Sequence, residues 1–163
     1  MSELRNILRA IYRKDFSTLE RLSPADANIK DQDGRTPLMH AVLDEDADPA
    51  LVKLLIARGA DVNAVEAEQK WSALHFAARD KKEAIVRSLL EAGAAVDATN
   101  VFGNTPLWET VMSSTRSLSV ARELLRHGAD PYRKNNDGVA PIDIAGRTGC
   151  VELLNLFQER SRN

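Results

Sequence analysis

The chain has 163 residues, of which 44% are hydrophobic and only 5% are aromatic. This composition favours closely packed helices with small aliphatic side chains over a sandwich of aromatic-rich strands. The net charge of −2 argues against a dedicated nucleic-acid-binding domain, which usually has a basic surplus. The single cysteine, Cys150, excludes a disulfide within the chain and favours a reducing compartment.

The sequence also predicts where the protein resides. Its first residues, Met1 to Arg5, contain no uninterrupted apolar run such as a secretory signal needs. No window approaches the roughly 20 consecutive apolar residues that span a bilayer. We therefore expect a cytoplasmic protein that makes no membrane contact.

Residues 1–30 predict a pair of helices that caps the N-terminal end of the domain. Four residues at helical spacing form one apolar stripe of the first helix: Leu4, Ile7, Leu8 and Ile11. The second helix is expected to begin near Phe16 and to end at Ser23-Pro24. Such a cap would shield the end of a repeat array from water.

Two motifs then recur in phase along the chain. The first reads TPLMHA (36–41), SALHFA (72–77), TPLWET (105–110) and APIDIA (140–145). Its first residues lie 36, 33 and 35 positions apart. The second motif is a leucine-rich helix that ends at Gly59, Gly93 and Gly128, which are 34 and 35 positions apart. Two motifs in phase indicate a repeat protein far more strongly than either motif alone.

Local chemistry explains why each repeat should form two helices. Thr36 and Thr105 precede prolines, so their hydroxyls can cap a helix that opens with proline. Ser72 can cap its helix in the same way, whereas Ala140 cannot, which weakens the start of the last repeat by about 1 kcal/mol. Glycine at the end of the second helix can adopt the left-handed turn that closes it.

This pattern resembles the ankyrin-repeat family, whose unit has about 33 residues and a Thr-Pro-Leu-His-x-Ala core. The resemblance implies an all-α repeat solenoid of helix-turn-helix units joined by hairpin loops. We predict a single domain over residues 1–163, with the cap at 1–30. The four repeats are expected at residues 31–64, 65–99, 100–134 and 135–163.

Several departures from the family pattern carry expectations of their own. The turns at residues 44–49 and 113–117 are longer than usual and are expected to project from the body. Lys70 stands where a hairpin glycine is expected, which predicts a distorted second hairpin. Trp108 replaces the histidine of the core motif. His40 and His75 are interpreted as equivalent hydrogen-bonding residues that stack along the solenoid.

No group of residues predicts catalysis. The histidines, the carboxylates and Cys150 do not cluster at metal-ligand spacing, and the glycines are single rather than gathered in a phosphate-binding loop. Cys150 is expected to be inert at the start of the last helix. We therefore predict no catalytic residue, no metal, no cofactor and no small-molecule ligand.

The family resemblance implies that a partner binds to the hairpin tips and to the exposed side of each first helix. Large apolar residues at such positions, above all Trp71 and Phe102, are typical anchors of protein interfaces. For these two the alternative is packing on neighbouring hairpins, and for Trp108 packing is the favoured interpretation. The candidate binding residues are Arg35, Leu43, Asp44, Trp71, Arg79, Asp80, Phe102, Asn104, Trp108, Met112, Val139 and Arg147.

The sequence therefore predicts a protein–protein interaction module, an adaptor or an inhibitor, that is monomeric by itself. A narrower alternative is an immunity protein that neutralises a toxic enzyme. An enzyme subunit and a nucleic-acid binder are less favoured, because no polar site is clustered and the net charge is close to zero.

Overall fold

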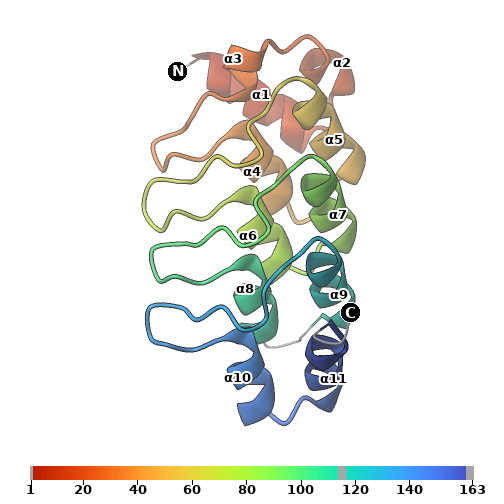
Figure 1. The fold of residues 1–163 in the computed structure, drawn as a ribbon. Coiled ribbons are helices and arrows are strands. Elements are labelled where there is room, and N and C mark those ends of the chain that lie inside the picture. The colour runs from red at the N-terminus through yellow and green to blue at the C-terminus, as the bar shows by residue number, and fades with distance from the viewer. Residues whose placement is uncertain (1, 114–116, 161–163) are drawn as a thin grey trace.

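The computed structural model describes residues 2–113 and 117–160, and it confirms the predicted all-α repeat solenoid. Figure 1 shows two columns of stacked helices, with all hairpins projecting on the side of one column. That column holds the inner helices, α4 (Pro37–Leu43), α6 (Ala73–Arg79), α8 (Pro106–Met112) and α10 (Pro141–Arg147). The other holds the outer helices, α5 (Pro49–Ala57), α7 (Glu83–Glu91), α9 (Leu118–Arg126) and α11 (Val151–Arg160).

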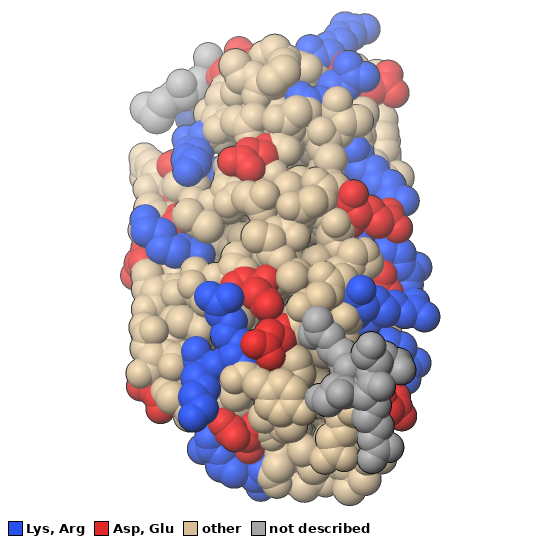
Figure 2. All heavy atoms as spheres, viewed as in Figure 1, with Lys and Arg blue, Asp and Glu red and all other residues tan. Residues whose placement is uncertain are grey.

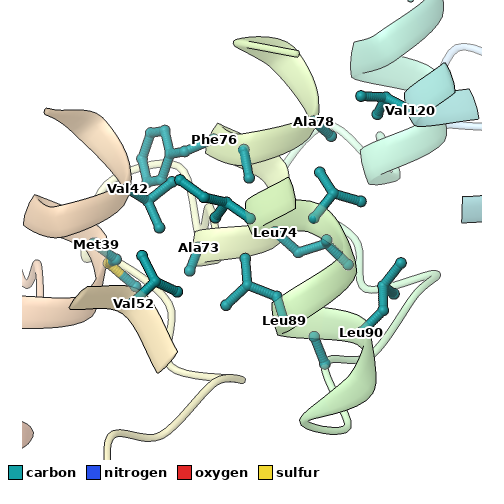
Figure 3. Packing of buried hydrophobic residues seen from close by; sticks show 14 of the residues in the cluster. Met39, Val42, Val52, Ala73, Leu74, Phe76, Ala78, Leu89, Leu90 and Val120 are labelled. Atoms are coloured by element: carbon teal, nitrogen blue, oxygen red, sulfur yellow. The ribbon is translucent and has the colours of Figure 1, made fainter. Parts of the chain in front are cut away.

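The core lies between the two columns and runs continuously along the stack. Leu38, Leu74 and Leu107 occupy the same position of three successive inner helices, and each is at most 1% exposed. The outer helices add Leu55, Leu89 and Leu124, which are fully buried. Figure 3 shows part of this cluster, with side chains from α4, α5, α6 and α7 in one packed layer. Each repeat therefore buries its apolar surface mainly against its neighbours.

The predicted helix caps are confirmed. The hydroxyls of Thr36, Ser72 and Thr105 each accept a hydrogen bond from the backbone amide three residues later. Ala140 makes no side-chain cap, as expected. The carboxylate of Asp143 accepts from the Ala140 amide at 2.8 Å instead, which satisfies one donor at this helix start.

The N-terminal segment differs from the prediction in one respect. It contains α1 (Ser2–Tyr12), α2 (Phe16–Leu19) and a further short helix, α3 (Pro24–Ala27). Ser23-Pro24 begins α3 and does not end a helix, because the Ser23 hydroxyl accepts from the Asp26 amide at 3.2 Å. A Ser-Pro pair can supply a cap followed by a first helical residue, and here it does so.

The hairpins share one way of turning. In three of them a side-chain oxygen of Asp31, Asn100 or Asn135 accepts from the amides two and four residues later. Neighbouring hairpins are joined through backbone bonds, from Ala67 N to Asp33 O at 2.8 Å and from Val101 N to Gln69 O at 2.9 Å. The hairpins therefore form a continuous ledge along the solenoid.

The second hairpin closes in a different way, as the missing glycine predicts. The Glu66 carboxylate accepts from the amides of Glu68, Gln69 and Trp71 at 2.7–2.9 Å. Lys70 takes the left-handed conformation, with φ of 61°. The longer Glu66 side chain thus replaces the Asp or Asn of the other hairpins and spans the extra residue.

Replacing Lys70 with glycine should stabilise the protein by up to about 1 kcal/mol, because glycine adopts positive φ without a Cβ clash. Equilibrium denaturation in urea would measure the gain. Lys70→Ala is the matched control, since it keeps the Cβ and should give no gain. If the glycine variant is no more stable than the alanine variant, the positive φ at residue 70 does not strain the native backbone.

The first of the two longer turns is tied to the next repeat. Glu45 and Asp46 are exposed as expected, while Lys82 Nζ donates to the carbonyl oxygens of Val42 and Asp44. The centre of the second turn, residues 114–116, lies outside the described residues. Within the described part of the chain, no helix is long and apolar enough to cross a lipid bilayer.

Candidate functional site

The predicted binding residues lie on two kinds of element, the hairpins and the inner helices. We call this region the hairpin–helix surface: the hairpins at residues 31–35, 66–71, 100–104 and 135–139, with the sides of α4, α6, α8 and α10 that do not pack on the outer helices. Four of the predicted residues directly precede a helix cap, namely Arg35, Trp71, Asn104 and Val139. Four others end the inner helices, namely Leu43, Arg79, Met112 and Arg147.

Large apolar side chains are exposed in the third repeat. Phe102 at the hairpin and Met112 at the end of α8 are each 51% exposed, and Val101 is 45% exposed. Arg79, Asp80 and Arg147 are also exposed. The remaining predicted residues at the surface are half-buried: Arg35, Leu43, Asp44, Trp108 and Val139.

The expectation that Trp71 is an exposed anchor is wrong. Its side chain is 9% exposed and packs against Phe76, with ring centroids 5.2 Å apart. The Glu66 carboxylate holds the Trp71 amide at 2.9 Å, which places this residue at the foot of the hairpin instead of its tip. Trp71 is therefore packed as the alternative from the sequence required, but against α6 of its own repeat instead of a neighbouring hairpin.

Trp71 supports an ordered arginine. The Arg79 guanidinium lies 5.2 Å from the centre of the Trp71 ring and 5.5 Å from that of Phe76. Two hydrogen bonds to Asp80, Nε to Oδ1 at 2.7 Å and Nη2 to Oδ2 at 3.0 Å, fix its orientation. The bond to Asp80 raises the pKa of Arg79 further above its usual range. The stack presents a fixed cation at the surface.

Asn104 is likewise buried, being 7% exposed, and it belongs to a polar network that the sequence did not reveal. Its Nδ2 donates to Glu109 Oε1 at 3.1 Å, and Asn100 Nδ2 donates to the same oxygen at 3.2 Å. Asn135 Nδ2 in turn donates to Asn104 Oδ1 at 2.9 Å. Glu109 was not predicted, although the sequence holds one signal for it: a carboxylate where the other repeats have His40, Phe76 and Ile144.

Burial is the main influence on Glu109, which is 8% exposed. It raises the pKa of the carboxyl group above its usual value, against the opposing effects of the Asn104 and Asn100 amides and of the Arg79 charge. Glu109 is therefore a desolvated carboxyl group within the hairpin–helix surface.

The interpretation of His40 and His75 as equivalent residues is wrong by one position. His75 stands three residues after its cap Ser72, whereas His40 stands four residues after Thr36. His75 Nε2 donates to Asn104 O of the next hairpin at 3.2 Å. His40 Nε2 pairs with Asp31 at 2.8 Å, and its Nδ1 contacts the Tyr12 hydroxyl at 3.1 Å. Each histidine makes structural hydrogen bonds, but of different kinds.

Trp108 occupies the position of His75 in its own helix, and it packs against the core as the sequence favoured. Its indole Nε1 is buried without an acceptor among the described residues. The bond that His75 makes to the next hairpin therefore has no counterpart between the third and fourth repeats.

Metal chemistry finds no support in the described part of the chain, where no three His, Cys, Asp or Glu side chains cluster. Figure 2 shows that acidic and basic residues are interspersed over the face in view, so neither sign forms one continuous field there. Fixed charges and exposed apolar side chains are what this surface offers.

Comparisons with known proteins agree with this architecture. A family model described as "Ankyrin repeats (3 copies)" matches residues 7–100, and one described as "Ankyrin repeat" matches residues 102–136. The ankyrin repeat and KH domain-containing protein mask-1 of Caenorhabditis elegans is 41% identical over 74% of this chain and 4% of its own length.

Two other relatives are similar over comparable stretches. The putative ankyrin repeat protein FPV031 of fowlpox virus is 32% identical over 77% of this chain and 37% of its own length. Neurogenic locus notch homolog protein 2 of Homo sapiens is 32% identical over 80% of this chain and 6% of its own length. The chain thus spans well under half of each of these relatives. The matched repeats show that the chain belongs to the ankyrin-repeat family, whose repeats are protein–protein interaction modules.

Proposed function

We propose that this chain binds a partner protein through the hairpin–helix surface and has no catalytic activity of its own. The observation that carries the proposal is the exposure of Phe102 and Met112, each 51%, beside Val101, which is 45% exposed. Exposed aromatic and methionine side chains among polar neighbours are the usual anchors of protein interfaces.

The Arg79 stack supports the same proposal. Arginine and aromatic residues contribute strongly at interfaces, and the guanidinium is already oriented by Trp71, Phe76 and Asp80 before any partner arrives. A side chain that is ordered in the free protein loses less conformational entropy on binding. Binding here would therefore use a largely preformed surface.

The mixed charge around these residues favours a protein partner over a nucleic acid. The sequence carries 22 basic and 24 acidic residues, and phosphate backbones are recognised by a basic surplus. In this proposal the free chain is a monomer in the cytoplasm. It acts as an inhibitor where it covers its partner's working surface and as an adaptor where it leaves that surface free.

Replacing Phe102 and Met112 together with alanine should weaken partner binding at least about 100-fold, because two interface anchors are removed. A partner recovered with the native chain would be tested by calorimetry against the variant. The thermal transition should stay within a few degrees, since both side chains are half exposed.

Val151→Ala is the matched control. Val151 is 59% exposed and begins α11, an outer helix. Its removal should leave partner affinity unchanged. Equal loss in both variants, or no loss in either, would place the binding site elsewhere.

A further inference from the structure

Three carboxylate side chains are buried in the described part of the chain: Glu66, Glu109 and Glu123, which are 5%, 8% and 5% exposed. A buried carboxylate is costly unless hydrogen bonds or opposite charges replace its lost water. The surroundings of the three can therefore be compared within one molecule.

Two of them are fully compensated. Glu66 accepts from three backbone amides, which lower its pKa although burial alone would raise it. Glu123 faces two arginine side chains of the outer helices, with Arg87 Nε at 3.4 Å and Arg126 Nη1 at 3.8 Å. His127 Nδ1 lies 3.8 Å from the same carboxylate and donates to the Glu123 carbonyl oxygen at 3.0 Å. Each has a structural role that is complete within the chain.

Glu109 is different, because its partners are neutral. Asn100 and Asn104 donate to the same oxygen, Oε1. No basic side chain among the described residues forms an ion pair with it, and the guanidinium of Arg79 is already bound to Asp80. Its pKa is raised by burial, where that of Glu66 is lowered. Of the three carboxylates, this one alone has neither an ion pair nor a set of backbone donors among the described residues, and the Arg79 charge that acts on it is shared with Asp80.

The site is also held in place before any ligand arrives. Asn135 of the next hairpin donates to Asn104, which in turn donates to Glu109, so two hairpins fix the carboxyl group. Met112 lies one helical turn beyond Glu109 on α8 and is 51% exposed. A carboxylate near an exposed thioether suits a side chain with an aliphatic stem and a cationic end.

We infer that Glu109 is the subsite for a lysine or arginine side chain of the bound protein. The inference rests on the proposed function and adds the chemistry of one anchor. The incoming cation compensates the buried carboxylate of Glu109, as backbone amides do for Glu66 and arginine side chains do for Glu123. Its methylene groups lie along Met112, and its charged end donates to the carboxylate of Glu109.

The test uses peptides selected from a random library on the full-length chain. Those that bind at the hairpin–helix surface, identified by loss of binding to Phe102→Ala, should carry a Lys or Arg. Replacing that residue with norleucine in the peptide should weaken binding about 10- to 100-fold. Glu109→Gln should weaken the parent peptide similarly, because glutamine keeps the acceptor for both asparagines but loses the charge.

A double-mutant cycle then isolates the pair. The norleucine peptide should bind Glu109→Gln as well as it binds the native chain. Glu123→Gln, on the outer helices, is the matched control: it removes a buried charge far from this surface, so it should leave the affinity for both peptides unchanged. Two results would overturn this inference and leave the proposed function standing. One is selected peptides that bind this surface without a basic residue; the other is a loss of affinity on norleucine substitution that persists in Glu109→Gln. A library that yields no binder sensitive to Phe102→Ala would count against the proposed function and the inference together.

Discussion

Replacing Leu74 with alanine should lower the free energy of unfolding by about 2–5 kcal/mol, because the truncation leaves a cavity in a closely packed core. Leu74 is 1% exposed in α6, which packs against both α4 and α8. The cavity would open at the centre of the stack, where repeats on both sides depend on the same side chain. Urea denaturation followed by circular dichroism would measure the loss.

Ile142→Ala is the control, because Ile142 occupies the position of Leu74 in the last repeat. It is half-buried, with a neighbouring inner helix only on its N-terminal side within the described chain. Its removal should cost about 1–2 kcal/mol and speed hydrogen exchange mainly in α10 and α11. Equal losses at the two positions would show that stacking of neighbours is not the source of the burial.

The parts of the fold that depend on short segments were predictable. The caps at Thr36, Ser72 and Thr105 follow from one hydroxyl and the next three residues. The left-handed glycines at the helix ends, such as Gly59 with φ of 89°, follow from a backbone need that few other residues meet. Such features recur in every repeat, and recurrence made them visible.

The predictions that were wrong or missing concern contacts between repeats, or side-chain atoms that an alignment of motifs does not consider. Trp71 is buried because its backbone amide donates to the Glu66 carboxylate, which holds the residue at the foot of the hairpin. The spacing of the repeats does not predict this hydrogen bond. The network at Glu109 joins Asn100, Asn104 and Asn135 from two hairpins. The error at His40 was one of register, since the two histidines differ by one place relative to their caps. One residue of shift on a short helix changes which partners a side chain meets.

The candidate site follows the same division. Phe102 and Met112 could be predicted as exposed because the repeat frame fixes hairpin and helix-end positions. The fixed Arg79 could not, because its orientation depends on the buried rings of Trp71 and Phe76 and on the carboxylate of Asp80. Position within a repeat thus predicts exposure, whereas the order of a charged side chain depends on what lies beneath it.

Acidification should weaken the protein through His75. This side chain is fully buried, and burial lowers its pKa from 6.5 to about 4. Ser72 N donates to Nδ1 at 3.2 Å, so the proton of the neutral ring lies on Nε2, which donates to Asn104 O at 3.2 Å. A second proton on Nδ1 would oppose the Ser72 amide and remove the acceptor at this helix start.

The sign follows from proton uptake. Between pH 6.5 and about 4 the unfolded chain binds a proton at this histidine and the folded chain does not, so stability is present above pH 6.5 and is lost as the pH falls. The loss attributable to His75 should reach about 3 kcal/mol near pH 4. Glu109 acts in the opposite direction. Its pKa is raised in the folded chain, so its contribution to stability grows as the pH falls towards the pKa that it has in the unfolded chain.

Comparison of variants separates the two effects. His75→Asn keeps an acceptor for the Ser72 amide and has no titrating ring, so it should be less stable at pH 7 but lose less stability on acidification. Urea denaturation at intervals from pH 7.5 to 4 would give the slopes, a range that brackets the titration. If the free energy of unfolding falls equally with pH in the native chain and in His75→Asn, folding does not lower the pKa of His75, and the prediction is wrong.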